Sequence, residues 1–416
     1  MAFGFGRGLP KFERSMWALL GSFLVQHTGF YLALPFLAVI FTQQFGLTPG
    51  QAGLVLAVIS LSYQIAGVIG GPLSDRIGRR LTMVPGLFLQ AVGFLSYAWV
   101  RSLWALVGAG VLVGVGGGLF APAARAGIAA LASDEQERTT AFSVRGVAAN
   151  IGMSIGPLLG AVLIGSPLLF FGAAAVFHAV LALALPLLLP SGCEKGACSA
   201  GAGGAILRAL RNLPFVLFSL AAVVIWALDA QMTTAMPMRV AELTGTAKAI
   251  GPLSTLSSVL VIVLQVPIST LLLRRLHPLT AMAAGILMTG AGLASVAWAR
   301  NFLHLTGSVA VVALGQMLYV PTIDNTVSTF ARGEAIGSFF GIATLVWGLG
   351  TAIGNLVGGQ AVAVARRLGR PALPWFFFAA LAAIAAIGLI VLRRWTTMRA
   401  ALRRNAAQDD GSDQLQ

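Results

Sequence analysis

Long apolar runs dominate this chain and restrict what it can fold into. A helix needs about 20 mainly apolar residues to cross a bilayer, and the 416-residue sequence contains repeated runs of that kind. Only 10% of the residues are charged, against about 25% in soluble domains. The sequence therefore predicts an all-α membrane protein with twelve transmembrane helices, at residues 16–42, 51–71, 81–100, 103–128, 142–164, 168–189, 214–240, 251–273, 280–298, 303–325, 337–361 and 373–394.

The basic residues predict which ends of these spans face the cytoplasm. Lys and Arg accumulate in cytoplasmic loops, and with the N-terminus inside, 20 of the 27 Lys and Arg residues fall on that side. We therefore expect both termini in the cytoplasm, with the protein in the inner membrane. The net charge of +14 does not indicate nucleic-acid binding, because the charges lie in short loops between apolar runs.

The chain is predicted to consist of two related halves. Residues 190–213 form a polar linker between residues 1–189 and 214–394, and residues 395–416 form a cytoplasmic tail. Four local patterns recur in the second half at offsets between 195 and 202 residues: Pro72 at Pro267, Pro122 at Pro321, Gly152 at Gly350 and Pro35 at Pro237. Repeated halves are typical of secondary transporters that bind substrate near the bilayer midplane.

The linker holds the two cysteines, Cys193 and Cys198. Cytoplasmic thiols stay reduced, so we expect no disulfide. Two thiols alone do not complete a structural zinc site, and we expect no metal.

A charged stretch joins the second and third apolar runs. Ionisable side chains avoid hydrocarbon, so residues 71–80 are predicted to form a tight turn at the membrane surface, with Gly78 supplying the backbone freedom. The acid among its arginines suggests a charge cluster that changes partners during gating, made by Gly71, Asp75, Arg76, Gly78, Arg79 and Arg80. The alternative is a simple topology signal, which accounts for the arginines but not for Asp75.

This stretch resembles the signature loop between helices 2 and 3 of the major facilitator superfamily. The fifth apolar run resembles a motif of that superfamily's drug:proton antiporter branch, through Gly152, Gly156, Pro157 and Gly160. The overall pattern is most similar to the multidrug-resistance H-type members. The resemblance implies two six-helix halves and efflux by alternating access, driven by the proton gradient without a cofactor, in a monomer.

The fifth-run motif has a physical reading beside the resemblance. Small residues one turn apart let helices approach closely, and Pro157 removes a backbone donor and bends its helix, which suits a gating role. Ordinary helix packing is the alternative. One departure concerns the fourth run, where the antiporter branch carries an Arg and this chain has Gly110. The usual helix-4 arrangement for proton coupling is therefore missing.

Asp229 is the one acid of the sequence near the middle of an apolar run. An ionisable residue at that depth is costly and is a functional candidate by default. His27 lies eight residues before Pro35 as Asp229 lies eight before Pro237, so we expect the two at equivalent depths in the two halves. Histidine titrates near neutral pH. We predict that Asp229 and His27 share or exchange the coupling proton; a helix-packing hydrogen bond is the alternative.

Arg125 and Asp324 form a second candidate pair, 199 residues apart near the cytoplasmic ends of the fourth and tenth runs. The resemblance implies that these helices close an inner gate, so we predict an ion pair between the halves. A bridge within one half, from Arg125 to Asp75, is the alternative.

The remaining candidates are aromatic, amide, hydroxyl and Met side chains within the runs. Adaptable surfaces of this kind suit bulky amphiphilic ligands. The predicted substrate cavity comprises Gln26, Phe30, Tyr31, Tyr63, Gln64, Asn150, Trp226, Thr233, Met236, Gln265 and Trp347. The favoured function is proton-coupled drug efflux. The alternatives are a sugar or metabolite transporter of the same fold, a non-transporting receptor, and a membrane enzyme, which the absence of a nucleophile–base pattern or Walker loop disfavours.

Overall fold

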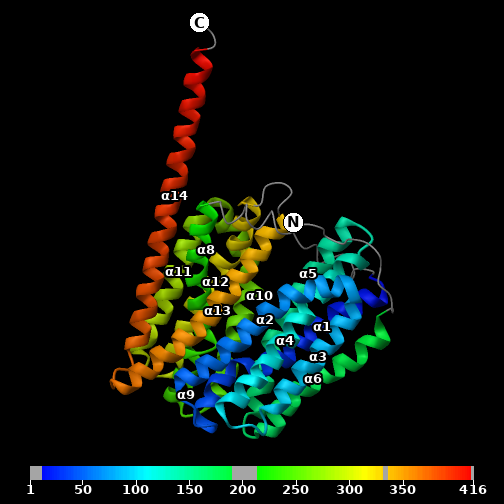
Figure 1. The fold of residues 1–416 in the computed structure, drawn as a ribbon. Coiled ribbons are helices and arrows are strands. Elements are labelled where there is room, and N and C mark those ends of the chain that lie inside the picture. The colour runs from blue at the N-terminus through cyan, green and yellow to red at the C-terminus, as the bar shows by residue number, and fades with distance from the viewer. Residues whose placement is uncertain (1–11, 190–212, 331–335, 414–416) are drawn as a thin grey trace. The chain divides into compact units, whose positions relative to one another are not determined.

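A computed structural model describes residues 12–189, 213–330 and 336–413, and within these ranges it contains helices and no strand (Figure 1). The predicted all-α class is confirmed. The linker residues 190–212, with both cysteines, lie outside the described residues. The helices fall into two compact units.

Unit 1 holds described residues 12–47, 54–189 and 246–258. Its elements are α1 (Arg14–Val39), the π-turn η1 (Ile40–Gln44), most of α2 (Pro49–Ile77), α3 (Arg79–Ser96), α4 (Leu103–Leu131), α5 (Glu135–Leu163), α6 (Pro167–Leu188), the 3₁₀ turn η3 (Ala247–Ala249) and the first part of α10 (Ile250–Pro267).

Unit 2 holds described residues 48–53, 213–245, 259–330 and 336–413. Its elements are α8 (Leu213–Asp229), η2 (Ala230–Met232), α9 (Ala235–Thr244), the rest of α10, η4 (Ile268–Leu272), η5 (Leu273–Arg275), α11 (Pro278–Ser295), η6 (Val296–Trp298), α12 (Phe302–Phe330), α13 (Ile336–Arg367) and α14 (Leu373–Asp413).

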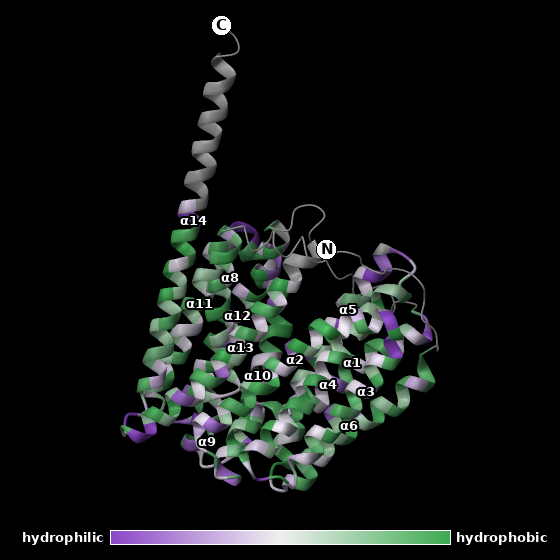
Figure 2. Cartoon of the chain, viewed as in Figure 1, coloured by the Kyte–Doolittle hydropathy of each residue, from purple (hydrophilic) through white to green (hydrophobic). Residues whose placement is uncertain are grey.

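Eleven helical segments of the described chain are long and apolar enough to cross a membrane. The predicted run 81–100 forms α3, which has 18 residues and begins with two arginines, and it falls short of that standard. Figure 2 shows hydrophobic residues along the helices and hydrophilic residues gathered near their ends. Leu187 and Leu303 leave 85% and 78% of their surface exposed, which suits side chains that face lipid.

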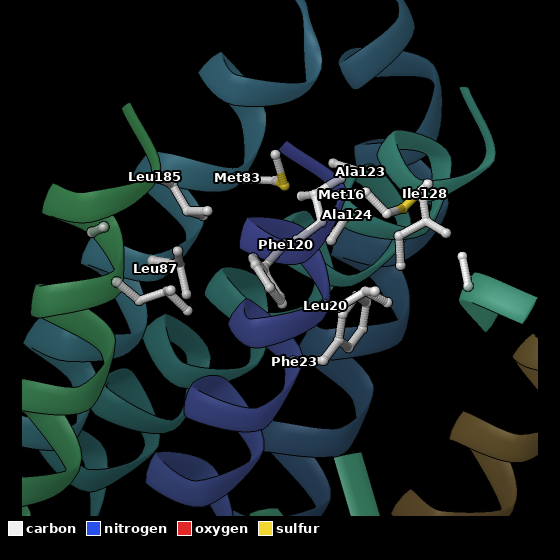
Figure 3. Packing of buried hydrophobic residues seen from close by; sticks show 14 residues of the cluster. Met16, Leu20, Phe23, Met83, Leu87, Phe120, Ala123, Ala124, Ile128 and Leu185 are labelled. Carbon is white, nitrogen blue, oxygen red and sulfur yellow. The ribbon is translucent and has the colours of Figure 1, made fainter. Parts of the chain in front are cut away.

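A cluster of buried apolar side chains fastens the helices of unit 1 together (Figure 3). Met16, Leu20 and Phe23 from α1 face Phe120 and Ala124 from α4. The rings of Phe23 and Phe120 lie 5.7 Å apart at a tilt of 54°, a favourable aromatic arrangement. This core fixes α1 beside α4 and so determines where the α1 side chains point.

The same close helix contact occurs within each unit, and its residues in unit 2 follow those in unit 1 by 199 positions. In unit 1, a methyl group on Gly86 of α3 would lie 2.7 Å from the carbonyl oxygen of Gly116 of α4. In unit 2, Gly285 of α11 meets Gly315 of α12 at the same 2.7 Å. Such distances admit only glycine without a backbone shift. The internal repeat therefore extends to the packing.

One predicted loop is wrong, and two other predicted segments have secondary structure that the sequence did not indicate. Residues 71–80 are not a loop: α2 runs to Ile77 and α3 starts at Arg79, so the turn is Gly78 alone, with φ 99°. The predicted tail from residue 395 continues α14 as a helix to Asp413. In both places hydropathy marks where a span ends, whereas helical hydrogen bonding continues into polar sequence. The run 214–240 lies within one candidate span, Leu213–Thr244, but its helix is interrupted after Asp229.

Candidate functional site

Asp229 ends α8 and accepts two side-chain hydrogen bonds from α12. Gln316 Nε2 and Tyr319 Oη each donate to Asp229 Oδ1 at 2.7 Å. Tyr319 is fully buried, and Asp229 and Gln316 are half-buried. Gln316 and Tyr319 are three residues apart, so both side chains leave the same face of α12. The structure thus places Asp229 against two polar side chains of α12 within unit 2.

The helix that carries Asp229 breaks immediately after it. The 3₁₀ turn Ala230–Met232 follows, and α9 starts only at Ala235. The buried Thr234 donates to Asn355 Oδ1 of α13 at 2.6 Å. Gln231 Nε2 donates to the Gly354 carbonyl of α13 at 2.9 Å. The side chains of Gln231 and Thr234 therefore hydrogen-bond to α13, which satisfies polar groups that are buried at this break in the helix.

Glycines bring α13 against α8 on the other side of Asp229. A methyl group on Gly350 would lie 2.7 Å from Val223 O, and one on Gly354 would lie 2.6 Å from Ala227 Cα. Beside this contact, the ring of Trp226 is 6.2 Å from that of Tyr319 and also 6.2 Å from that of Trp347. Trp347 is 38% exposed. An aromatic surface therefore adjoins the acid.

The predicted glycine motif of α5 has the same role in unit 1. A methyl on Gly152 would lie 2.7 Å from Leu24 O of α1, and one on Gly156 would lie 2.7 Å from Thr28 O. Gly160 meets Leu32 O and the Phe36 ring. Pro157 and Ala161 receive Gly251 from the first turn of α10. Whether these contacts change during gating stays a prediction.

His27 lies on α1 beside this contact. Its Nδ1 is 2.9 Å from the Phe23 carbonyl, and its ring stacks near that of Tyr31 at 6.1 Å and 14°. The hydrogen bond to its own helix turn fixes the ring and leaves Nε2 as the second nitrogen. His27 is half-buried. Asp229 belongs to the other unit, so proton exchange between the two stays a prediction.

The expectation of equivalent depths for His27 and Asp229 is wrong. His27 Cβ faces Gly152 as Trp226 Cβ faces Gly350, and these contacts make Trp226 the counterpart of His27 at an offset of 199 residues. Asp229 lies three residues farther along its helix, about 4.5 Å at 1.5 Å per residue. The offset of 202 at Pro35 and Pro237 includes the extra residues of the break, which α1 lacks.

The gating candidates of α2 and α3 lie at or near the junction of these helices, and Arg125 and Asp324 lie within α4 and α12. Arg76 lies in the last turn of α2, Arg79 and Arg80 begin α3, and Gly71 lies inside α2 with nothing within 4 Å of an added methyl group. The side chain of Asp75 lies outside the described residues. Arg125 is exposed on α4 and its Nε donates to Ala121 O at 3.2 Å. Asp324 is exposed on α12 in the other unit, so the predicted gate pair stays untested.

The predicted cavity residues separate into distinct environments. Asn150 Nδ2 bonds Gly146 O of its own helix, and Gln265 Nε2 bonds Met317 O of α12 at 3.2 Å. Thr233 bonds Ala230 O at the helix break. Four others are buried or half-buried within unit 1, with Phe30 packed edge-on to Tyr31: Gln26, Phe30, Tyr63 and Gln64. Met236 is buried in α9.

Sequence reasoning missed the groups that bind Asp229. Gln316 and Tyr319 were detectable as two polar residues at helical spacing within an apolar run. Asn355 occupies the position in the repeat that Pro157 occupies in unit 1. A polar residue in place of a proline was the sequence feature that could have predicted a hydrogen bond at the break. In unit 1, the Arg145 guanidinium lies 5.2 Å from the Phe23 ring centre, a cation–π distance.

Sequence comparison identifies relatives across nearly the whole chain. The family model of the Major Facilitator Superfamily matches residues 19–355. The chain is 29% identical over 366 residues to multidrug resistance protein MdtH of Aeromonas hydrophila, covering 86% of this chain and 90% of that protein. It is 27% identical over 371 residues to MdtH of Cronobacter sakazakii, covering 88% and 90%.

Solved structures agree on the fold. A POT family transporter in complex with 5-aminolevulinic acid superimposes with a TM-score of 0.74 at 14% identity, covering 92% of this chain and 97% of that one. Another POT family transporter, crystallised in meso, gives a TM-score of 0.74 at 17% identity, covering 94% and 99%.

Proposed function

The chain belongs to the Major Facilitator Superfamily, and from that premise we propose that it exports amphiphilic small molecules in exchange for protons. The family and fold predicted from sequence are confirmed. The protein is a multi-pass membrane transporter of small molecules, not an enzyme. The proposal adds the exported class, the proton coupling, the inner-membrane location, the cytoplasmic termini and the monomeric state. It uses the proton gradient as its energy source and no cofactor.

The observation that carries the coupling proposal is the pair of donors on Asp229. Both hydrogen bonds end on Oδ1, and among the described residues no donor is placed on Oδ2, which is the oxygen left for the proton. Hydrogen bonds to an ionised acceptor are roughly twice as strong as neutral ones. Protonation of Asp229 therefore weakens the attachment of α8 to α12, and deprotonation strengthens it.

This change can reach the helix break. Asp229 is the last residue of α8, and the 3₁₀ turn that follows it is bonded to α13 through Gln231 and Thr234. A shift of α8 relative to α12 moves the 3₁₀ turn Ala230–Met232. Irregular segments of this kind are where conformational changes often take place. Asp229 is thus the coupling acid. His27 is the second candidate proton site.

The exported class follows from the surface next to Asp229. Trp226 and the partly exposed Trp347 form an aromatic pair, and Trp226 also contacts the ring of Tyr319, which binds the Asp229 carboxylate. Aromatic faces attract cations and adapt to flat apolar groups. The similar MdtH proteins are named for multidrug resistance. Lipophilic cations are therefore the first substrates to test.

Gating is assigned to the glycine contacts of α5, the charged α2–α3 junction, and Arg125 with Asp324. The last two close an inner gate between the halves, and pairing of Arg125 with Asp75 is the alternative. Gly110, where an Arg is usual, favours a second candidate function: a sugar or metabolite transporter of the same fold without proton coupling.

The test is proton movement in energised everted membrane vesicles challenged with a panel of lipophilic cations. We expect the wild type and Glu13→Gln, a control at an exposed acid whose side chain makes no cap bond, to dissipate the proton gradient when a substrate is added. Asp229→Asn should not. If no compound moves protons through the wild type, drug:proton exchange is wrong and the second candidate replaces it.

A further inference from the structure

A cavity of about 150 Å³ opens in unit 2 where α9, the end of α13 and the start of α14 meet. Its lining includes Arg239 and Glu242 from α9, Arg366 from α13, and Trp375 from α14. Figure 2 shows hydrophilic residues gathered around α9. The cavity is many times larger than the space one water needs, and it lies away from Asp229 and its donors.

The charges around this cavity do not cancel. Arg366 donates to Glu242 Oε1 through Nη2 at 2.6 Å and through Nε at 3.2 Å. The other carboxylate oxygen, Oε2, is 3.6 Å from Arg239 Nη1. Two guanidinium groups therefore share one carboxylate, which leaves an excess of one positive charge in a partly enclosed, largely apolar space.

Arg239 is the less satisfied of the two arginines. Its side chain is only 18% exposed, and its Nε–H has no hydrogen-bond partner among the described residues. A buried N–H of a charged group without an acceptor is destabilising. Arg239 also lines the cavity, so a ligand bound there would lie against its guanidinium group.

We propose that this cavity binds a phosphate group, carried either by a phospholipid headgroup or by a soluble phosphate. Guanidinium groups bind phosphate through paired, charge-assisted hydrogen bonds. The two arginines come from different helices, and a tetrahedral phosphate presents oxygens in several directions at once, so one phosphate can accept hydrogen bonds from both. Trp375, Met238 and Pro374 form apolar walls for the glycerol or ester part of the ligand.

Glu242 acts as a competing internal anion in this site. It occupies Arg366 with two hydrogen bonds and lies at ion-pair distance from Arg239. Removing its charge releases both arginines for the ligand, while removing the Arg239 charge leaves the cavity close to neutral. Substitutions at two neighbouring residues of one helix should therefore change phosphate affinity in opposite directions.

The test is isothermal titration calorimetry on the purified full-length protein in a neutral detergent. One arm titrates short-chain phosphatidylglycerol and the other titrates inorganic phosphate. In the arm that binds, Arg239→Gln should weaken binding at least about tenfold, as expected for loss of a charge-assisted hydrogen bond, and Glu242→Gln should tighten it. Arg367→Gln is the matched control, because it removes the same charge from the residue next to Arg366 but outside the cavity lining.

If only phosphatidylglycerol binds, the cavity is a site for a lipid headgroup. If inorganic phosphate binds as well, the cavity also accepts soluble phosphate. Absence of binding in both arms, or an equal effect of Arg239→Gln and Arg367→Gln, overturns the proposal. If Arg239→Gln does not fold, Glu242→Gln decides: unchanged or weaker binding contradicts the site. Arg239→Lys, which keeps the charge but loses Nε, should fall between the wild type and Arg239→Gln.

Discussion

The first helices of the two units share one packing register but differ at one point. α1 contacts α5 through Gly152, Gly156 and Gly160, and α8 contacts α13 through Gly350 and Gly354. Yet α1 is a continuous helix from Arg14 to Val39, whereas α8 ends at Asp229 and resumes as α9 after a 3₁₀ turn.

The two units share their glycine packing, and they differ at the helix that carries Asp229, the proposed coupling acid. Glycine contacts are needed in both units because close helix packing in a membrane relies on small residues. A break and a buried acid are destabilising, and they occur together in only one of the two helices. We infer that the scaffold is symmetric and that the proton chemistry is not.

The most sensitive point of the comparison is the pair of donors on Asp229. Tyr319→Phe and Gln316→Leu each remove one hydrogen bond to its Oδ1. Each should slow proton-driven transport about tenfold, and the double variant more, because hydrogen bonds to a charged acceptor contribute about 1.5–3 kcal/mol. The measurement is substrate-dependent proton flux in everted vesicles. Equal flux in the double variant and the wild type would remove Asp229 from the coupling account.

The shared packing register predicts equal damage in the two units. Gly156→Ala and Gly354→Ala should each lower stability by about 1–3 kcal/mol, since the added methyl meets backbone atoms of α1 or α8. Thermal unfolding of the purified protein gives the ranking.

Gly146→Ala in α5 and Gly341→Ala in α13 are the matched controls, because nothing lies within 4 Å of the added atom. A large loss of stability in Gly156→Ala with none in Gly354→Ala would show that the two equivalent contacts do not contribute equally to stability.

Asn355 sharpens the contrast at the break. Asn355→Ala removes the acceptor of Thr234 and should lower stability by about 1–2 kcal/mol, because a buried hydroxyl loses its partner. Its counterpart Pro157→Ala removes no hydrogen bond and should be close to neutral. Differential unfolding of the two variants measures the contrast. If Pro157→Ala lost more stability than Asn355→Ala, the hydrogen bond of Asn355 would not be what stabilises the interrupted helix of unit 2.

The smallest effect is expected at His27. It lies three residues out of register with Asp229 and already bonds its own helix. His27→Gln should therefore reduce proton-driven transport by less than Asp229→Asn does, in the same vesicle assay. A loss as large as that of Asp229→Asn would make the two halves equal partners in coupling.

The sequence was sufficient for the helical class and for eleven of the twelve predicted spans, because hydrophobicity over 20 residues is a strong signal. It was insufficient for the break after Asp229. No Pro or Gly marks Ala230-Gln231-Met232-Thr233-Thr234, and the irregular backbone depends on hydrogen bonds to α13. The donors on Asp229 come from 87 and 90 residues away, and only the folded arrangement of α8 and α12 brings them together.

The register error at His27 has the same origin. Aligning the halves at their prolines treated the three residues of the break as part of a regular helix. The glycine contacts give the correct register because they depend on helix-to-helix distance, which tolerates no insertion.

The central claim is that Asp229 couples transport to protons without being needed for alternating access itself. The direct test uses proteoliposomes of the wild type, Glu13→Gln and Asp229→Asn, with a lipophilic cation that the vesicle panel identifies. The account predicts that Asp229→Asn retains substrate exchange at equilibrium but no longer accumulates substrate in response to a proton gradient. Accumulation at the wild-type rate in Asp229→Asn would contradict it.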